Sequence, residues 1–262
     1  MSKNKHIAMW TCRRSRSTVT TLAFEQLNEC LIFDAPFYAP YLLYGNKDEP
    51  HKQEIINNFE TDYQQIIAQI TGDLPEGFRF SFQRHIAQET LPLFGRDWLK
   101  DLDSFFLIRH PKSIICSYQK VYERLGIDSD ITMDDIAIDV LFNLFEEVRS
   151  ITGKTPLVID SADLAKHPRK VLQFLCAHFD VNFLEKMLTW DTGLKNSKLV
   201  PEHLPAVKKN WQEIWYNTIN QSSQFLPYEE NKQVNVPDQL IPLLEYCLPF
   251  YEKLHHYCPS FD

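Results

Sequence analysis

Five short apolar segments, each rich in β-branched or aromatic residues, alternate along this chain with longer segments whose apolar residues recur at α-helical spacing. This alternation constrains the fold most, because strands separated by helices pair in parallel through right-handed crossovers. The expected strands are residues 6–10, 31–34, 78–82, 104–109 and 156–160. The expected helices are residues 17–29, 51–71, 111–124, 133–151, 168–179, 206–220 and 237–256. We therefore predict a three-layer α/β fold of the P-loop type, with a mainly parallel central sheet of about five strands and helices on both faces.

The chain shows no internal repeat, low-complexity tract or Gly/Ser linker, so we expect residues 1–262 to form one domain. Pro111 and Pro168 stand where a first helical turn tolerates proline and mark two helix starts. Residues from about 200 onward are expected to form a helical C-terminal cover over one edge of the sheet. The amphipathic helix near 240–257 either packs internally or forms a homodimer, and the sequence leaves both open.

The charge balance excludes several classes of partner. Lys and Arg number 27 against 35 Asp and Glu, a net charge of −8 that disfavours nucleic acid and polyanionic polysaccharides. No apolar stretch approaches the ~20 residues that span a bilayer, so we expect a cytoplasmic protein without membrane contact. The six dispersed cysteines lack zinc-ligand spacing, which predicts reduced core residues and no metal site.

The loop after the first expected strand concentrates positive charge. Its three arginines and three hydroxyl residues are Arg13, Arg14, Ser15, Arg16, Ser17 and Thr18. A helix beginning at Ser17 or Thr18 adds unpaired N–H groups and a partial positive charge, so the segment is typical of an anion cradle. A simple N-cap with solvated arginines is the alternative, but it leaves this concentration of charge unexplained. A Walker A loop is disfavoured, because the positions of its glycines and lysine hold other residues.

A second basic strand end lies near the middle of the chain. Arg109 ends the expected strand 104–109, Pro111 begins a helix, and Ser117 follows two helical turns later. Arg109 and Ser117 can converge on one anion. Taken alone, the motif is equally consistent with two other roles: pairing of Arg109 with a carboxylate, and an ordinary helical position for Ser117.

Taken together and in this order, the two motifs resemble those of the sulfotransferase family. Arg14 to Thr18 is similar to the family's 5′-phosphosulfate loop, with Arg16 where cytosolic members commonly have glycine. Arg109 and Ser117 match its 3′-phosphate motif. A fainter similarity to bacterial sulfotransferase-like proteins covers most of the chain. The resemblance implies 3′-phosphoadenosine 5′-phosphosulfate (PAPS) as co-substrate, with no metal.

The resemblance also implies roles for individual residues. Arg14 stabilises charge on the departing phosphate, and the residues that bind the co-substrate are expected to be Arg13, Arg14, Ser15, Arg16, Ser17, Thr18, Arg109 and Ser117. His85 resembles the catalytic histidine of many members, and Asp34 is the alternative base or a contact to a cationic acceptor. Both could instead be capping residues. Arg84 either assists the transfer or forms a salt bridge, and His110 is expected to be structural. Candidate C-terminal contacts to the 3′-phosphate are Lys195, Lys198, Lys208 and Lys209.

The implied function is a sulfotransferase that moves a sulfuryl group to a hydroxyl or amine of a small acceptor. The acidic chain and the aromatic residues Phe37, Tyr38, Tyr41 and Tyr44 favour a neutral or cationic acceptor. Bacterial members tailor natural products, among them guanidinium alkaloid toxins. Two alternatives remain: a non-catalytic protein that binds PAP (the desulfated donor product, 3′-phosphoadenosine 5′-phosphate) or another nucleotide, and a small-molecule kinase.

Overall fold

A central sheet of five parallel strands organises the computed structural model, which describes residues 4–45, 47, 49–92, 95–126, 130–195, 197–226, 228 and 235–261. The strand order is β2-β3-β1-β4-β5. The bounds are β1 (Lys5–Thr11), β2 (Cys30–Asp34), β3 (Phe80–Ile86), β4 (Asp103–Ile108) and β5 (Leu157–Asp160). The structure confirms the predicted α/β fold with its parallel sheet. Four strands lie within one residue of the predicted segments at each end, whereas β3 begins two residues later and ends four residues later than the predicted 78–82, so that it includes His85.

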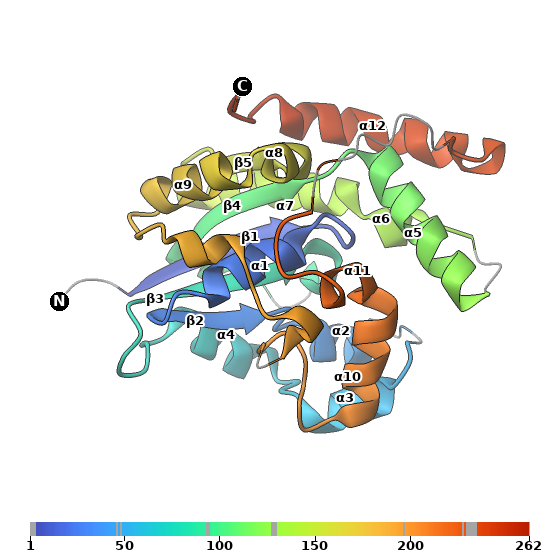
Figure 1. The fold of residues 1–262 in the computed structure, drawn as a ribbon. Coiled ribbons are helices and arrows are strands. Elements are labelled where there is room, and N and C mark those ends of the chain that lie inside the picture. The colour runs from blue at the N-terminus through green and yellow to red at the C-terminus, as the bar shows by residue number, and fades with distance from the viewer. Residues whose placement is uncertain are drawn as a thin grey trace.

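Helices cover both faces of the sheet (Figure 1). One face packs against α4 (Tyr63–Thr71), α5 (Pro111–Leu125), α7 (Ile138–Thr152) and α12 (Ile241–His255). The other packs against α1 (Ser17–Glu25), α8 (Ser161–Lys166) and α9 (Pro168–His178). The apolar runs of the strands follow from this arrangement, because a parallel sheet covered on both faces exposes neither to water.

A third, smaller core joins the C-terminal region to the segment after β2. It brings α2 (Tyr38–Tyr44) and α3 (Lys52–Asn58) against α10 (Pro205–Asn210), the orange helix beside them in Figure 1. Beyond α10 come a π-helical turn, η6 (Trp211–Trp215), and α11 (Asn217–Asn220). The elements between residues 205 and 220 are here called the cover segment.

Several predicted helices are divided in the structure. The segment 51–71 forms α3 and α4, because Asp62 accepts from the N–H groups of Gln64 and Gln65 and starts a new helix. The segment 133–151 is split into α6 (Met133–Ile136) and α7 by Ala137, which has a φ of 50°. Helices α2 and α8 were not among the predicted segments, and both are short.

The predicted helix at the C-terminus forms as α12 and packs internally along one face. Cys247 and Leu254 are buried in the core shared with α7, while Tyr246 remains exposed. Among the described residues, no helix has the length and apolar character needed to cross a membrane. All six cysteines are free, and five of them are buried.

Candidate active site

A cavity of about 1040 Å³ lies at the carboxyl end of the sheet, where α/β folds commonly bind ligands. Its wall includes the loop after β1, the ends of β2 and β3, the start of α5 and the cover segment. The volume is at the upper end of the range for small-molecule sites, about 300–1,000 Å³, so it suits two bound molecules. Nine of the predicted site residues line it: Arg13, Arg14, Ser15, Arg16, Ser17, Thr18, Asp34, Arg109 and Ser117.

The loop after β1 has an unusual backbone. Arg14 and Arg16 both adopt left-handed conformations, with φ of 65° and 63°. Such angles cost a non-glycine residue roughly 1–2 kcal/mol. Arg16 therefore retains the conformation that favours glycine at this position, and α1 begins directly after it at Ser17.

The two basic motifs meet at this loop. Arg14 donates from Nε to the Ser117 hydroxyl at 3.0 Å, and Arg109 donates from Nη1 to the Arg14 carbonyl at 2.5 Å. These residues are about a hundred positions apart in the chain, and the order of β1 beside β4 brings them together. Arg14, Arg16, Arg109 and Ser117 are here called the basic end of the cavity.

Within the described part of the chain, no carboxylate forms a salt bridge with Arg14, Arg16 or Arg109. Burial lowers the pKa of all three arginines, and nearby Arg16 and Arg14 help to lower that of Arg109 to about 9. Among the described residues, Asp160 is the carboxylate whose charge acts on Arg16 and Arg109, and it acts to raise the pKa of both without forming a salt bridge with either. Because three charged guanidinium groups share a desolvated region, an anionic ligand would stabilise them.

Ser15 supports the same conclusion. Its side chain is fully buried against the cavity, and its hydroxyl has no hydrogen-bond partner among the described residues. Buried hydroxyls normally have partners, so a ligand oxygen is the group that this position can accommodate.

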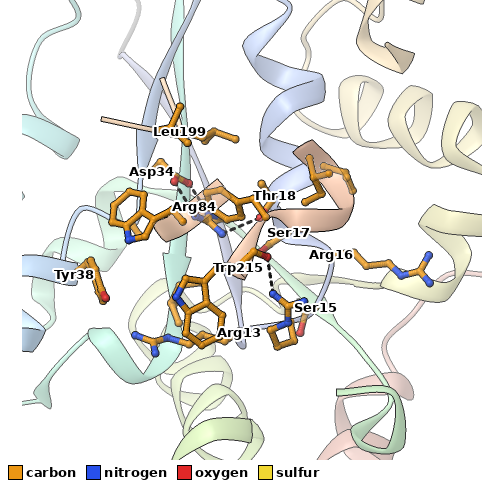
Figure 2. A pocket seen from close by; sticks show the side chains of 18 of the residues that line it. Arg13, Ser15, Arg16, Ser17, Thr18, Asp34, Tyr38, Arg84, Leu199 and Trp215 are labelled. Atoms are coloured by element: carbon orange, nitrogen blue, oxygen red, sulfur yellow. Dashed lines mark hydrogen bonds and ion pairs between the residues drawn. The ribbon is translucent and has the colours of Figure 1, made fainter. Parts of the chain in front are cut away.

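A buried ion pair joins β2 to β3 beside this loop. Asp34 and Arg84 are register partners, and the carboxylate binds the guanidinium through both oxygens, with 2.7 Å between Arg84 Nη2 and Asp34 Oδ2. Arg84 also donates to Thr18 at 3.2 Å and to the Tyr216 hydroxyl at 2.9 Å, and Figure 2 shows the pair reaching Thr18. Burial opposes the charge of Arg84, but Asp34 and Tyr216 raise its pKa above the ordinary value. Asp34 thus positions Arg84, and neither of its oxygens is free to act as a base.

Arg13 points away from the basic end. Its guanidinium donates to Glu49 at 2.6 Å and to Glu89 at 3.2 Å, and lies 5.6 Å from the ring centres of Tyr38 and Tyr41. Figure 2 shows Arg13 and Arg16 directed to opposite sides. The structure therefore does not bring Arg13 to the other cations, in contrast to the sequence prediction. Glu49 and Glu89, which both bind Arg13 and line the cavity, are here called the acidic wall.

His85 lies outside the cavity, which corrects its prediction as a base. Its side chain stacks on Trp10 at 4.3 Å and is 1% exposed, and Nε2 bonds to Gln83 Oε1 at 2.9 Å. Alternate residues of a strand face opposite sides, so Arg84 and Ile86 line the cavity while His85 faces the core. Burial lowers the pKa of His85 to about 3, so the ring is neutral near pH 7.

The remaining candidate residues, His110 and four lysines, lie in different parts of the structure. His110 caps α5 by accepting from the Lys112 N–H at 3.2 Å, as a structural residue would. Lys198 lines the cavity, whereas Lys208 pairs with Glu202 and Lys209 lies 3.9 Å from Glu213. Lys195 is not among the lining residues.

Sequence reasoning missed the residues that the cover segment contributes. The Tyr216 N–H donates to the Trp211 carbonyl at 2.8 Å, five residues back. The Trp215 carbonyl, at the end of this turn, accepts from Arg14 at 2.8 Å. The acidic wall was missed as well. Glu89 follows β3 at the carboxyl edge, and that position is the only sequence signal it offers.

Comparison with known proteins gives concordant matches. The family model of the sulfotransferase domain matches residues 5–257. A structure of the sulfotransferase domain from the curacin biosynthetic pathway superposes with a TM-score of 0.56 at 15% identity, covering 98% of this chain and 100% of that one. A sulfotransferase from Alicyclobacillus acidocaldarius gives 0.55 at 10% identity, covering 98% and 96%.

One curated relative is much longer than this chain. "Branched-chain-amino-acid aminotransferase-like protein 2" from Arabidopsis thaliana is 27% identical over 248 residues. The match takes in 95% of this chain but 41% of that protein.

Proposed function

This chain belongs to the sulfotransferase family, and from that premise we propose that it transfers a sulfuryl group from PAPS to a hydroxyl or amine of a small acceptor. The observation that carries the proposal is the meeting of the two basic motifs, Arg14 with Ser117 and Arg109 with the Arg14 carbonyl. Guanidinium groups in a cavity are suited to a ligand with phosphate at both ends.

The co-substrate would be held by residues of this chain at two places. Ser15, Ser17, Thr18 and the first N–H groups of α1 suit the 5′-phosphosulfate end, because a helix N-terminus and hydroxyls donate to anions. Arg109 and Ser117 suit the 3′-phosphate. The buried, unpartnered Ser15 hydroxyl fits this assignment.

Transfer of a sulfuryl group needs positioning and stabilisation of charge on the leaving phosphate. Arg14 in the loop and Arg84 beside it carry fixed positive charges, and Asp34 and Tyr216 hold Arg84 in place. An arginine does not release its proton near neutral pH, so their contribution is electrostatic.

The acceptor would bind in the part of the cavity that is lined by the acidic wall and by the aromatic residues next to it. Tyr38 and Trp211 contact each other edge to face at 6.0 Å, and both line this part of the cavity. Carboxylates and aromatic faces bind ammonium or guanidinium groups. We therefore infer a neutral or cationic small molecule, a class that includes guanidinium alkaloids and related natural products.

Calorimetric titration with PAP tests the binding half of this proposal. We expect the parent to bind PAP, and Arg109→Ala to bind it about 10- to 100-fold more weakly, since a charge-assisted hydrogen bond contributes about 1.5–3 kcal/mol. Arg79→Ala is the matched control, because Arg79 pairs with Glu29 outside the cavity.

The catalytic half is tested by transfer of ³⁵S from PAPS to a panel of amines and alcohols. Labelled product supports the proposal. PAP binding without transfer would indicate a non-catalytic nucleotide-binding protein, and stabilisation by ATP with magnesium but not by PAP would indicate a kinase.

A further inference from the structure

Glu89 occupies a position from which a side chain can reach a ligand in the cavity. It ends the short helical turn η1 (Ala87–Glu89), which follows β3 at the carboxyl edge of the sheet. Its side chain lines the cavity and is 3% exposed. A carboxylate in such a place is desolvated and belongs to the wall of the cavity in which an acceptor would lie.

One oxygen of this carboxylate is uncommitted. Oε1 accepts from Arg13 at 3.2 Å, whereas Oε2 is buried with no hydrogen-bond partner among the described residues. Arg13 also binds Glu49 at 2.6 Å, so one positive charge is shared between two carboxylates. The pair of acids therefore retains a net negative charge and a free lone pair.

The surroundings of Glu89 favour proton uptake near neutral pH. Burial raises the pKa of Glu89 to about 7, while Arg13 and Arg84 lower it and Glu49 raises it. Other titratable groups that interact with its charge are Tyr38, Tyr41 and Tyr216. Helix α7 also packs against η1, and its carboxylates Asp139, Glu146 and Glu147 interact elsewhere, with Tyr246, Arg149 and Arg96.

Three other acids and bases at the cavity are less suitable than Glu89. Asp34 uses both oxygens on Arg84, and Glu49 accepts from both Arg13 and the Tyr38 hydroxyl. His203 lies on an exposed part of the wall beside Phe59. Glu89 alone among these combines burial, an oxygen without a partner and a place on the cavity wall.

We propose that Glu89 is the proton acceptor of the transfer reaction, an inference that rests on the proposed function. The acceptor oxygen or nitrogen forms a bond to sulfur, the bond between sulfur and the bridging phosphate oxygen breaks, and that oxygen keeps the electron pair. The acceptor proton passes to Glu89 Oε2. The products are the sulfated acceptor, PAP and a neutral Glu89, which then releases its proton to water.

The test uses PAP release from PAPS with water as the acceptor, so that no acceptor needs to be identified. The parent rate should rise with pH to a plateau above about pH 7, because the ionised carboxylate is the active form. Glu89→Gln should lose at least about 100-fold in rate and lose this dependence, with PAP affinity unchanged within about two-fold.

Glu49→Gln separates proton transfer from the mere positioning of Arg13. This variant also removes a partner of Arg13 but keeps the Glu89 carboxylate, and without the negative charge of Glu49 the midpoint of the pH profile should move to lower pH. Infrared difference spectra should show a protonated carboxyl band near about pH 6 that Glu89→Gln abolishes.

The outcomes are distinguishable. A Glu89→Gln protein that binds PAP and releases it from PAPS within about three-fold of the parent rate would overturn the role of Glu89 alone. An unmoved midpoint in Glu49→Gln, or an ionised Glu89 at pH 6, would do the same. A parent protein that fails to bind PAP would instead overturn the proposed function.

Discussion

Neighbouring residues on β3 face opposite sides of the sheet, and this difference decides which side chains can contact a ligand. Arg84 faces the cavity, whereas His85 lies in an aromatic core with Trp10, Phe37 and Trp98 around it. A neutral, buried imidazole in this place contributes to packing. Its titration should therefore appear in stability and not in transfer.

We expect His85 to make the protein less stable in mild acid. Its pKa in the folded state, about 3, is below the ordinary value of about 6.5, so the unfolded state binds more protons between these values. Stability should be fully present above about pH 6.5 and fall by roughly 2 kcal/mol by about pH 5.

Urea unfolding of the parent and of His85→Asn at several pH values measures this effect. The variant should be less stable at neutral pH but show a shallower loss between about pH 6.5 and pH 5. Parallel pH curves for the two proteins would contradict the assignment.

The sequence predicted the residues of the basic end but not which neighbours face it. Arg14, Ser117 and Arg109 could be found because their motifs follow strands that end at one edge of a parallel sheet. His85 was misplaced because the strand predicted to end at residue 82 continues to Ile86, and alternate residues of a strand face opposite sides. The direction of Arg13 depends on the left-handed angles of the loop, which the sequence does not show.

Strands β2 and β3 are joined at their carboxyl ends by a pair of opposite charges. Their register places Asp34 beside Arg84, and both side chains are about nine-tenths buried. Removing one partner leaves an uncompensated buried charge, which costs about 3–5 kcal/mol.

We therefore expect Asp34→Asn to destabilise the protein by about 3 kcal/mol or more, and Asp34→Asn with Arg84→Met to recover much of that loss. Neither protein should transfer sulfate at the parent rate, because the first misplaces Arg84 and the second lacks it. Chemical denaturation measures the stabilities. A double variant no more stable than Asp34→Asn would show that burial of the uncompensated charge is not the cause.

At the scale of elements, strand positions were predictable and helix continuity was not. Short apolar runs identify buried strands, whereas helical periodicity persists across a break at an N-cap such as Asp62. The π-helical turn η6 was also beyond prediction, because one extra residue in a turn leaves the apolar pattern nearly unchanged.

The molecule as a whole combines an acidic composition with a local basic end. Its net charge of −8 should repel large polyanions from the cavity, while small anions reach the buried arginines. The volume of the cavity and the net negative charge of the protein together favour small acceptors.

A sulfated heparin oligosaccharide should therefore neither accept a sulfuryl group nor compete with PAP. In a displacement assay we expect less than about a two-fold change in PAP affinity at low ionic strength, where long-range repulsion is strongest. Competition comparable to that of PAP itself would show that the basic end is open to extended polyanions.

The hydrogen bond from Arg14 to the Trp215 carbonyl joins residues 201 positions apart. During synthesis, the sheet can begin to assemble once β5 has left the ribosome, but Arg14 gains this partner only after the π-helical turn η6 has followed. A nascent chain that stops after β5 contains every strand and still lacks one wall of its pocket. Full ligand affinity is thus acquired only after residues 211–215 have been made.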